Sequence, residues 1–212
     1  MDRESRRQRL TALGRGVARC RRCPLWRRAT HAVPGEGKLD AAVMVVGEGP
    51  GRQEDLSGRP FVGRAGRLLE QLLAGAGLRR EDVYITNIVK HRAATPTGSG
   101  HDRPPRAGEI AACRAWLLAQ IEIVRPRVIV TLGRHALAAF LPDAAIGECH
   151  GCPQPHDLCT ILPLYHPSYA LHNPGARPQL FRDMAALKRL VALRGPSRPS
   201  RRVGATRAPA PG

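Results

Sequence analysis

From residue 41 onward, short apolar runs alternate with segments whose hydrophobic residues recur at helical spacing. The strand-like runs cover residues 41–47, 82–89, 127–133 and 159–168. The helix-like segments cover residues 65–78, 105–124, 134–141 and 178–193. Apolar strands that alternate with helices require a mostly parallel sheet that is covered on both faces. We therefore predict an α/β fold of three layers, α/β/α, around a central, mostly parallel four-stranded sheet.

The ends of the predicted strands indicate where such a fold would bind a ligand. Ligands of open parallel sheets sit at the carboxyl ends of the strands. Three polar clusters fall at those ends, at residues 47–55, 87–91 and 165–168. We expect the functional site at that edge of the sheet.

The length and apolar content are those of a chain with one hydrophobic core. With 212 residues and 42% apolar composition, one sizeable core can be buried. We predict one domain over residues 1–193 and a disordered basic tail over residues 194–212, which is rich in Pro, Gly and Ser. The longest apolar runs have only strand length, and no apolar segment follows the basic N-terminus. A cytoplasmic monomer without membrane contact is expected.

The formal net charge of +17 is concentrated at the two ends of the chain. Residues 1–28 hold ten arginines and two acids, and residues 194–212 hold five arginines and no acid. Such an excess favours a polyanionic partner, since each phosphate that arginine neutralises releases counterions. Basic ends that serve only solubility are the alternative.

Six cysteines in a chain expected to be cytoplasmic indicate free thiols or metal ligands rather than disulfides. Cys20 and Cys23 form a C-x-x-C pair near the N-terminus. Cys149 and Cys152 form a second such pair, with Cys159 and two histidines close by in sequence. Zinc ligation is conceivable at the second pair from its residue types alone.

The first polar cluster belongs to a longer stretch, GEGPGRQEDLSGRPFVGRAGRLL, at residues 47–69. Its glycines follow G-x-G-x-G rather than the dinucleotide pattern G-x-G-x-x-G, and the next strand ends without an acid to hold a ribose. The glycines instead allow the backbone to approach a flat or phosphate-bearing ligand closely. The three acids, Glu48, Glu54 and Asp55, are either solvated or include a carboxylate that handles water or positive charge.

This stretch resembles the first motif of the family 4 uracil-DNA glycosylases, which reads G-E-[AG]-P-G, two variable residues, E-D, and then G-x-P-F-V-G-x-A-G-x-L-L. Two further motifs of that family follow in order, TNIVK at residues 86–90 and HPS at residues 166–168. The resemblance extends from about Leu10 to Leu193. It implies an enzyme of base excision repair that releases uracil from uracil-containing DNA and leaves an abasic site.

For the base, the resemblance implies a contact with an extruded uracil, because the glycosidic bond is not reachable inside the stack. Phe61 would lie flat on uracil, and the Asn87 amide would donate to O4 and accept from N3–H. The alternatives are a core phenylalanine and an asparagine that caps a turn. Leu171 would enter the space that the base leaves, as apolar side chains do when bases are displaced.

For the phosphates and the reaction, the resemblance implies two further sets of residues. Backbone amides of Gly47, Gly49 and Ser168 would hold the phosphates beside the extruded nucleotide. His166 would donate to uracil O2 as negative charge develops there. A carboxylate of the first motif would act beside the sugar and its water. Glu48 and Glu54 are the candidates, with Asp55 beside them.

The resemblance also implies a [4Fe–4S] cluster, held by the first C-x-x-C pair and two later cysteines. Cys113 stands at the fourth ligand position, but His91 replaces the expected third cysteine. Imidazole can ligate an iron–sulfur centre. Zinc with the set Cys20, Cys23, His91 and Cys113 fits equally well by ligand type and is the alternative. The family has an ordinary loop at residues 149–159, so we expect unligated thiols there.

The loop over residues 92–105 leaves a second activity open. A histidine directly after the N-x-V-K strand also occurs in UdgX-type relatives, which excise uracil and become joined to DNA through a histidine in this loop. His101 is the corresponding candidate nucleophile. The UdgX pattern differs at Gly49, where it has glutamine, and in a basic run before its histidine, so we expect ordinary turnover. A non-catalytic nucleic-acid-binding metal domain is the third hypothesis.

Overall fold

A computed structural model describes residues 2–95 and 101–192. The predicted basic tail, 194–212, lies outside the described residues, as does the middle of the loop over residues 92–105. The prediction of a single domain over residues 1–193 therefore stays a prediction.

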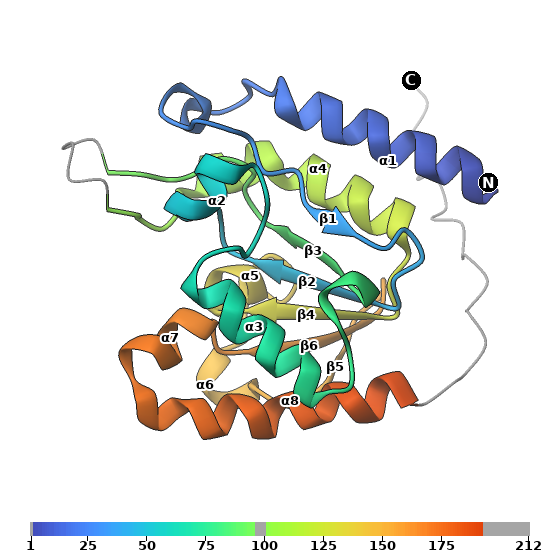
Figure 1. The fold of residues 1–212 in the computed structure, drawn as a ribbon, viewed down its shortest axis with the longest axis vertical. Helices are drawn as coiled ribbons and strands as arrows, with labels where there is room; N and C mark the ends of the chain where they lie inside the picture. The colour runs from blue at the N-terminus through green and yellow to red at the C-terminus, as the bar shows by residue number, and fades with distance from the viewer. Residues whose placement is uncertain (1, 96–100, 193–212) are drawn as a thin grey trace, which may run out of the picture.

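Four parallel strands form the centre of the sheet, as the sequence predicts (Figure 1). They are β2 (Val43–Gly47), β3 (Tyr84–Asn87), β4 (Val128–Leu132) and β6 (Thr160–Leu164), in the spatial order β3-β2-β4-β6. Two strands that the sequence analysis did not identify lie antiparallel at the edges, β1 (Glu36–Gly37) beside β3 and β5 (Gln154–Pro155) beside β6. Each has only two residues, which is too short for a periodic sequence signal.

The central strands are apolar on both sides because helices cover both faces. In β2, Val43 and Val45 point to one layer of the core, and Met44 and Val46 point to the other. All five residues of β2 are buried. This continuous burial is typical of a parallel sheet between two helical layers.

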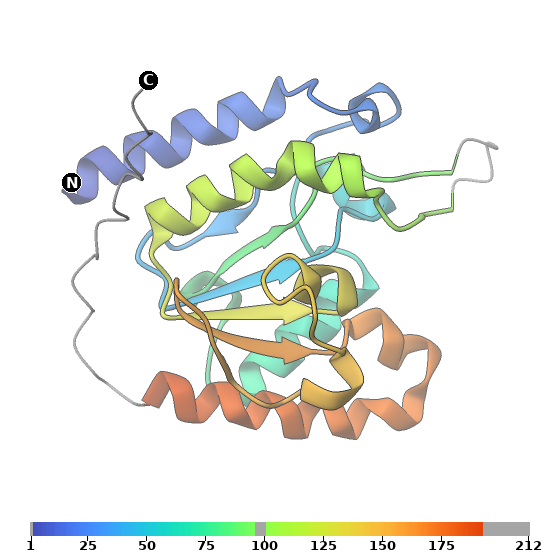
Figure 2. The same ribbon diagram turned by 180° about the vertical axis from the view of Figure 1, so that it is seen from behind.

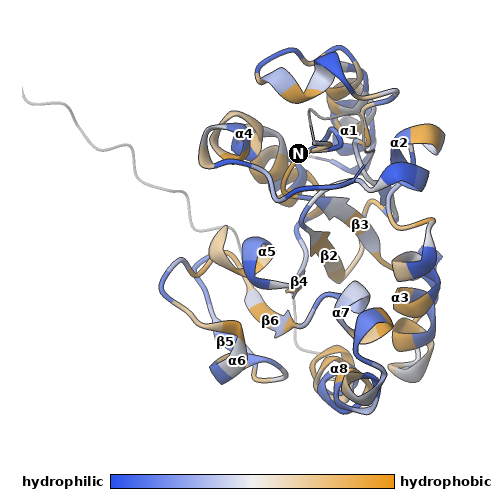
Figure 3. Cartoon of the chain, turned by 90° about the vertical axis from the view of Figure 1, so that its left-hand side faces the viewer, coloured by the Kyte–Doolittle hydropathy of each residue, from blue (hydrophilic) through white to orange (hydrophobic). Residues whose placement is uncertain are grey.

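The helices α3 (Arg64–Gly75), α7 (Pro167–His172) and α8 (Arg177–Ala192) cover the first face. Four leucines of α3 recur at helical spacing and are all buried, which is why this segment forms an amphipathic helix against the sheet. Figure 3 shows hydrophobic residues along the strands and on the side of α3 that faces them. The helix α7 begins directly after β6, at the carboxyl edge.

The helices α4 (Ala107–Val124) and α5 (Arg134–Ala138) cover the second face (Figure 2). Outside α4 lies α1 (Arg3–Ala18), a helix that the sequence analysis did not predict. Only Leu13 and Val17 of α1 are buried, against Ile123 of α4. Arg6 also donates to the carbonyl oxygens of Ile123 and Val124, the last residues of α4. These contacts join residues that lie more than a hundred positions apart in the chain. They hold in place a helix whose own hydrophobic pattern is weak.

The remaining short elements connect the layers and carry parts of the loops. They are η1 (Pro24–Arg27), α2 (Arg52–Ser57), η2 (Arg80–Asp82), α6 (Ile146–Cys149) and η3 (Pro174–Ala176). None of the described helices is both long enough and apolar enough to cross a membrane.

Candidate active site

The register of the sheet brings Gly47 and Asn87 side by side at the carboxyl edge. Phe61, from the loop between α2 and α3, completes this group. A Cβ atom at position 47 would lie 2.5 Å from Asn87 Oδ1 and 2.5 Å from Phe61 Cζ. Any side chain at position 47 would therefore displace the amide or the ring. The glycine keeps a flat space between a strand end and an aromatic face.

The side-chain amide of Asn87 is buried without a partner. The residue is 1% exposed, and within the described residues neither Nδ2 nor Oδ1 has a hydrogen-bond partner. A buried amide without partners costs free energy, of about 1–3 kcal/mol for each such group. Native proteins rarely keep such groups unless a ligand satisfies them. The amide is thus ready for a ligand with both a donor and an acceptor.

Phe61 is held in a strained backbone conformation. Its φ is +51°, in the left-handed region that non-glycine residues rarely adopt, and it is 5% exposed. Arg80 Nη1 donates to the Phe61 carbonyl oxygen at 2.9 Å. Gly66 allows the same carbonyl to come close to α3, since a Cβ there would overlap it. The ring is thereby fixed, with its centroid 5.9 Å from that of His166.

His166 is a neutral donor in this site. Burial lowers the pKa of His166 to about 4, and the charge of Glu54 opposes this shift. The Ser168 backbone N–H donates to Nδ1 at 3.1 Å, and Ser168 Oγ lies 2.6 Å from the same atom. Because Nδ1 is an acceptor, the hydrogen of the neutral ring is assigned to Nε2. Ser168 therefore fixes both the ring and its tautomer.

Glu48 follows Gly47 directly and lies beside the first residues of α5. Its Oε2 is 3.9 Å from His135 Nε2. Burial raises the pKa of Glu48, and the positive charges of His135 and Arg134 oppose this shift. The sequence analysis did not identify Arg134 and His135, although both follow the end of a predicted strand. The same strand-end argument that found the other clusters would have found them.

Within the described residues, the carboxylates of Glu54 and Asp55 accept hydrogen bonds from backbone N–H groups, and that of Glu48 does not. Glu54 Oε1 accepts from the backbone N–H groups of Val62 and Gly63, both at 2.8 Å, where α3 begins. Asp55 is buried, and its Oδ1 accepts from the Thr30 N–H at 2.9 Å. These two acids hold loops together. Glu48 is the acid of the first motif whose oxygens are not committed to backbone amides.

The other predicted substrate residues lie around the same edge. Gly49 is close to Val89, since a Cβ at position 49 would lie 2.9 Å from Val89 Cγ2. Leu171 is partly buried and packs against the core layer of α3 and α8. Tyr169, on the same helix, is 46% exposed. On α7 the exposed apolar side chain is therefore Tyr169 rather than Leu171.

The described ends of the loop over residues 92–105 pair as a small antiparallel bridge between Ala94 and Asp102. Asp102 forms an ion pair with Arg92 at 2.5 Å and lies near Gly51 of the first motif, where a Cβ would be 3.5 Å from its Oδ2. His101, the residue before Asp102, is exposed.

Cys20 and His91 line one open cavity of about 430 Å³, although 71 residues separate them in the chain. The volume of one water is about 30 Å³, so the cavity has room for a group of several atoms. Trp116 Nε1–H donates to Cys20 Sγ at 3.3 Å. The sequence analysis did not identify Trp116 as a neighbour of this site.

Cys113 and Cys23 are buried close to this cavity. Burial raises the pKa of the Cys113 thiol to about 11, the Lys90 backbone opposes this shift, and the neighbouring Cys23 and Cys20 add to it. Burial lowers the pKa of His91, so its imidazole is neutral, as a metal ligand must be. By residue type these four donors suit a thiolate-bound metal group, but their side chains are not gathered into one site. Within residues 2–95 and 101–192, no three His, Cys, Asp or Glu side chains are grouped so that they could hold a metal ion.

Lys90 joins the pocket to the cysteine region, and the sequence analysis gave it no role. Its buried Nζ donates to the Asn87 carbonyl, to Thr86 Oγ1 and to Gln120 Oε1, each at 2.7 Å. Burial lowers the pKa of Lys90 to about 7. The sequence alone does not show these contacts of Lys90, because Gln120 lies 30 residues away on α4.

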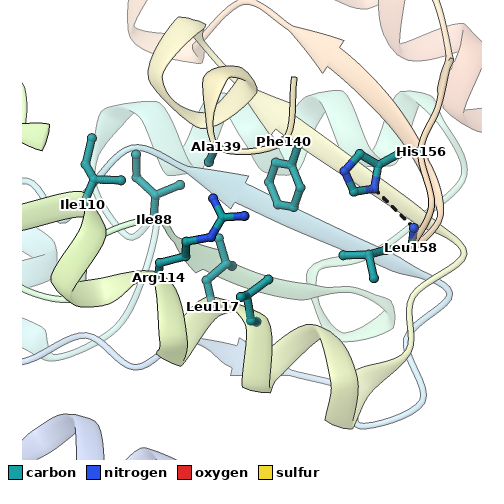
Figure 4. Close-up of a pocket in the computed structure, with 9 residues that line it drawn as sticks. Ile88, Ile110, Arg114, Leu117, Ala139, Phe140, His156 and Leu158 are labelled. Atoms are coloured by element: carbon teal, nitrogen blue, oxygen red, sulfur yellow. Dashed lines mark hydrogen bonds between the residues drawn. The ribbon is translucent and has the colours of Figure 1, made fainter. Parts of the chain in front are cut away.

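The second group of cysteines lies in the chain segment between α5 and β6. Cys149 Sγ donates to the Ala145 carbonyl at 3.2 Å, and burial raises the pKa of Cys159 to about 12. Nearby, a cavity of about 70 Å³ is lined mostly by apolar side chains (Figure 4). His156 lies at its rim and accepts from the Leu158 N–H. No carboxylate lines this cavity, so we place the candidate active site at the carboxyl edge instead.

Comparison with known proteins gives one consistent result. A model of the uracil DNA glycosylase superfamily matches residues 34–188. A type-4 uracil-DNA glycosylase of Thermotoga maritima is 48% identical over 160 residues, which are 74% of this chain and 80% of the relative. The type-4 enzyme of Saccharolobus solfataricus is 40% identical over 186 residues, which are 83% of each chain. That of Sulfurisphaera tokodaii is 40% identical over 185 residues, 82% of this chain and 81% of the relative.

Proposed function

This chain belongs to the uracil DNA glycosylase superfamily, and from that premise we propose that it hydrolyses the N-glycosidic bond of deoxyuridine in DNA. The products are uracil and an abasic site, as in base excision repair. One observation carries this proposal: the buried, unpartnered amide of Asn87 lies beside the fixed ring of Phe61. The named relatives, type-4 uracil-DNA glycosylases, support it.

An extruded uracil fits the chemistry of this pocket. The ring of Phe61 supplies a flat face for any base, and the amide of Asn87 supplies selection. In the proposed complex Nδ2 donates to uracil O4 and Oδ1 accepts from N3–H, whereas cytosine presents the reverse pattern. Base extrusion is required because the glycosidic bond is not accessible in the stack.

Two side chains act on the charges that develop as the bond breaks. The sugar becomes oxocarbenium-like, and uracil leaves as an anion. The neutral His166 donates from Nε2 to uracil O2 and stabilises the anion. Glu48 stabilises the sugar and takes a proton from the attacking water, whose oxygen forms the new bond to C1′. The placement of Glu54 and Asp55 on backbone amides supports Glu48 in this role.

We infer that Cys20, Cys23, His91 and Cys113 hold a [4Fe–4S] cluster. The shared open cavity of Cys20 and His91, which lie 71 residues apart in the chain, supports a common bound group for these two side chains. When bound, the cluster supplies four iron–ligand bonds that tie the segment after α1 to the end of β3 and to α4. The residues of the chain itself carry out the hydrolysis.

The experiment uses two labelled oligonucleotides that are identical except at one position, which holds uracil in the first and thymine in the second. After incubation, each sample is run on a denaturing gel with and without alkali. We expect a strand break at the uracil position only after alkali, because an abasic site is alkali-labile. Asn87→Asp is the loss-of-function control, and Asn173→Asp, at an exposed asparagine between α7 and η3, is its matched control.

Absence of an alkali-labile site in the wild-type lane would contradict the proposed activity. The same gel separates hydrolysis from covalent trapping through His101. A protein–DNA band that survives SDS and heat, and that disappears in His101→Ala, would contradict water as the nucleophile.

A further inference from the structure

Three rings form a continuous stack next to the pocket. The ring centroids of His150 and Tyr165 are 4.6 Å apart, and those of Tyr165 and Tyr169 are 5.1 Å apart. The inner end is anchored, because His150 Nδ1 lies 2.8 Å from Asp183 Oδ2 on α8. Gln179 Nε2 donates to the other oxygen of Asp183 at 2.6 Å. The stack is therefore supported from the core outward.

The outer end of the stack is open to solvent. Tyr169 is 46% exposed, whereas the other two rings are partly buried. Four large apolar side chains are exposed in the described residues, and the three besides Tyr169 are leucines: Leu56, Leu118 and Leu158. An exposed aromatic face on a supported stack is suited to a flat partner.

This exposed ring is continuous with the proposed uracil pocket. Tyr169 lies in the first turn of α7, and its N–H donates to the carbonyl of His166 at 2.9 Å. His166 itself faces Phe61 across the pocket. A DNA strand whose uracil enters the pocket would therefore run past α7 with its neighbouring bases. Leu171, the residue expected from the sequence to enter the space of the base, is partly buried and packs against the core layer, so Tyr169 is the more exposed of the two.

We propose that Tyr169 provides a stacking face for one nucleobase adjacent to the extruded uridine in the same strand. The inference rests on the proposed function, because it requires uracil-containing DNA in the pocket. Stacking on an aromatic ring is tolerant of base identity, since every base has a π-face. The surface would therefore increase affinity without adding sequence preference, and Tyr165 and His150 would keep the ring in place.

The test measures binding to a single-stranded oligonucleotide with a non-cleavable 2′-fluoro-arabino-uridine and the fluorescent base 2-aminopurine on its 5′ or its 3′ side. We expect quenching at one of these positions with wild-type protein and with Tyr169→Phe. With Tyr169→Ala, the quenching should be lost and the dissociation constant should rise about tenfold. Leu158→Ala, which removes another exposed apolar side chain, is the control and should bind like wild type. Thermal unfolding of each variant shows that it is folded.

Two results would overturn the proposal. One is wild-type affinity and quenching in Tyr169→Ala, and the other is a loss in Tyr169→Phe as large as in Tyr169→Ala, which would assign the effect to the hydroxyl. Uracil release is measured in parallel on a cleavable strand. If wild-type protein releases uracil but Tyr169→Ala changes nothing, only the stacking surface is refuted. If wild-type protein neither binds nor releases uracil, the proposed function is refuted and the surface with it.

Discussion

The pocket at the carboxyl edge and the cysteine region beside α4 are built in different ways. In the pocket, strand register and a strained loop hold Gly47, Asn87 and Phe61 within contact distance. In the cysteine region, Cys20 and Cys23 come from a segment outside the sheet. Trp116 Nε1–H donates to Cys20 Sγ there, and Cys23 and Cys113 are buried against core residues. The pocket is therefore shaped by adjoining strand ends and one strained loop, whereas the cysteine region brings together segments that lie far apart in the chain.

This difference shows what each region requires from outside the protein. The pocket leaves one amide without partners but needs no further atoms to keep its shape. Thiols in the cysteine region are buried, and burial opposes their ionisation, as the raised pKa of Cys113 indicates. A bound metal group would offset that cost and add bonds between the segments that carry its ligands. Its binding free energy would contribute to the free energy of folding, because the site is not preformed in the unfolded chain. We thus expect changes in the pocket to affect the rate and changes at the cysteines to affect stability.

Replacement of the pocket acid should produce the largest change in rate. Glu48→Gln is expected to lower the single-turnover rate of uracil release by about 10²–10⁴-fold, the range that a positioned acid or base contributes. Since the carboxylate must be ionised, the wild-type rate should fall as the pH falls through the Glu48 pKa, which burial raises above 4.5. The pH profile of the rate should lose this acidic limb in Glu48→Gln.

Two controls sharpen this prediction. Arg134→Gln removes a positive charge that lowers the Glu48 pKa, so its acidic limb should move to higher pH. Glu54→Gln should reduce the melting temperature, because Glu54 accepts two backbone N–H groups at the start of α3. If Glu54→Gln abolishes the acidic limb and Glu48→Gln retains it, the roles of these two acids are reversed.

Loss of a contact to the leaving base should have the next largest effect. His166→Ala and Asn87→Asp are each expected to lower the single-turnover rate by about a hundredfold or more, as the loss of one preorganised donor does. Asn87→Asp should also relax discrimination against cytosine. Both variants should keep wild-type iron content and visible absorption, because the cysteine region is held separately. Wild-type rates in both variants would show that the pocket is elsewhere.

A single methyl group in the pocket should have an intermediate effect. Gly47→Ala places a Cβ 2.5 Å from both the Asn87 amide and the Phe61 ring. Overpacking of this kind costs about 1–3 kcal/mol, so we expect a rate that is lower by about tenfold or more. Gly14→Ala is the matched control, because nothing lies within 4 Å of a Cβ there. Equal rates in the two variants would mean that the space beside Asn87 is not used.

The smallest change in rate is expected from the cysteine region. Cys113→Ser should lose iron and lower the melting temperature by at least about 5 °C, because ligand bonds between separate segments are lost. The rate per folded molecule should change by less than about tenfold, because Cys113 is not among the residues proposed to contact the base or the sugar. Cys159→Ser, which replaces a partly buried thiol outside the proposed ligand set, should keep its iron. Stoichiometric zinc without iron in anaerobically purified wild type would contradict the cluster.

Local sequence patterns predict most of the fold correctly. Apolar runs mark the four parallel strands, and leucines at helical spacing mark α3, because these patterns depend on neighbours within a few residues. The general rule for parallel sheets then places the polar clusters at the carboxyl edge. The helix α1 was missed, since its stability comes from contacts such as Arg6 with the end of α4, which its own residues do not show.

What each site residue contacts was decided only by the tertiary structure. The sequence by itself determined that three acids stand together after β2, at Glu48, Glu54 and Asp55. It did not show which one remains uncommitted, because Asp55 finds its backbone partner 25 residues away in Thr30. The cavity that joins Cys20 to His91 and the outward ring of Tyr169 also depend on packing between distant segments. Local propensity determines where strands and helices form, whereas burial and hydrogen-bond partners depend on how those elements pack.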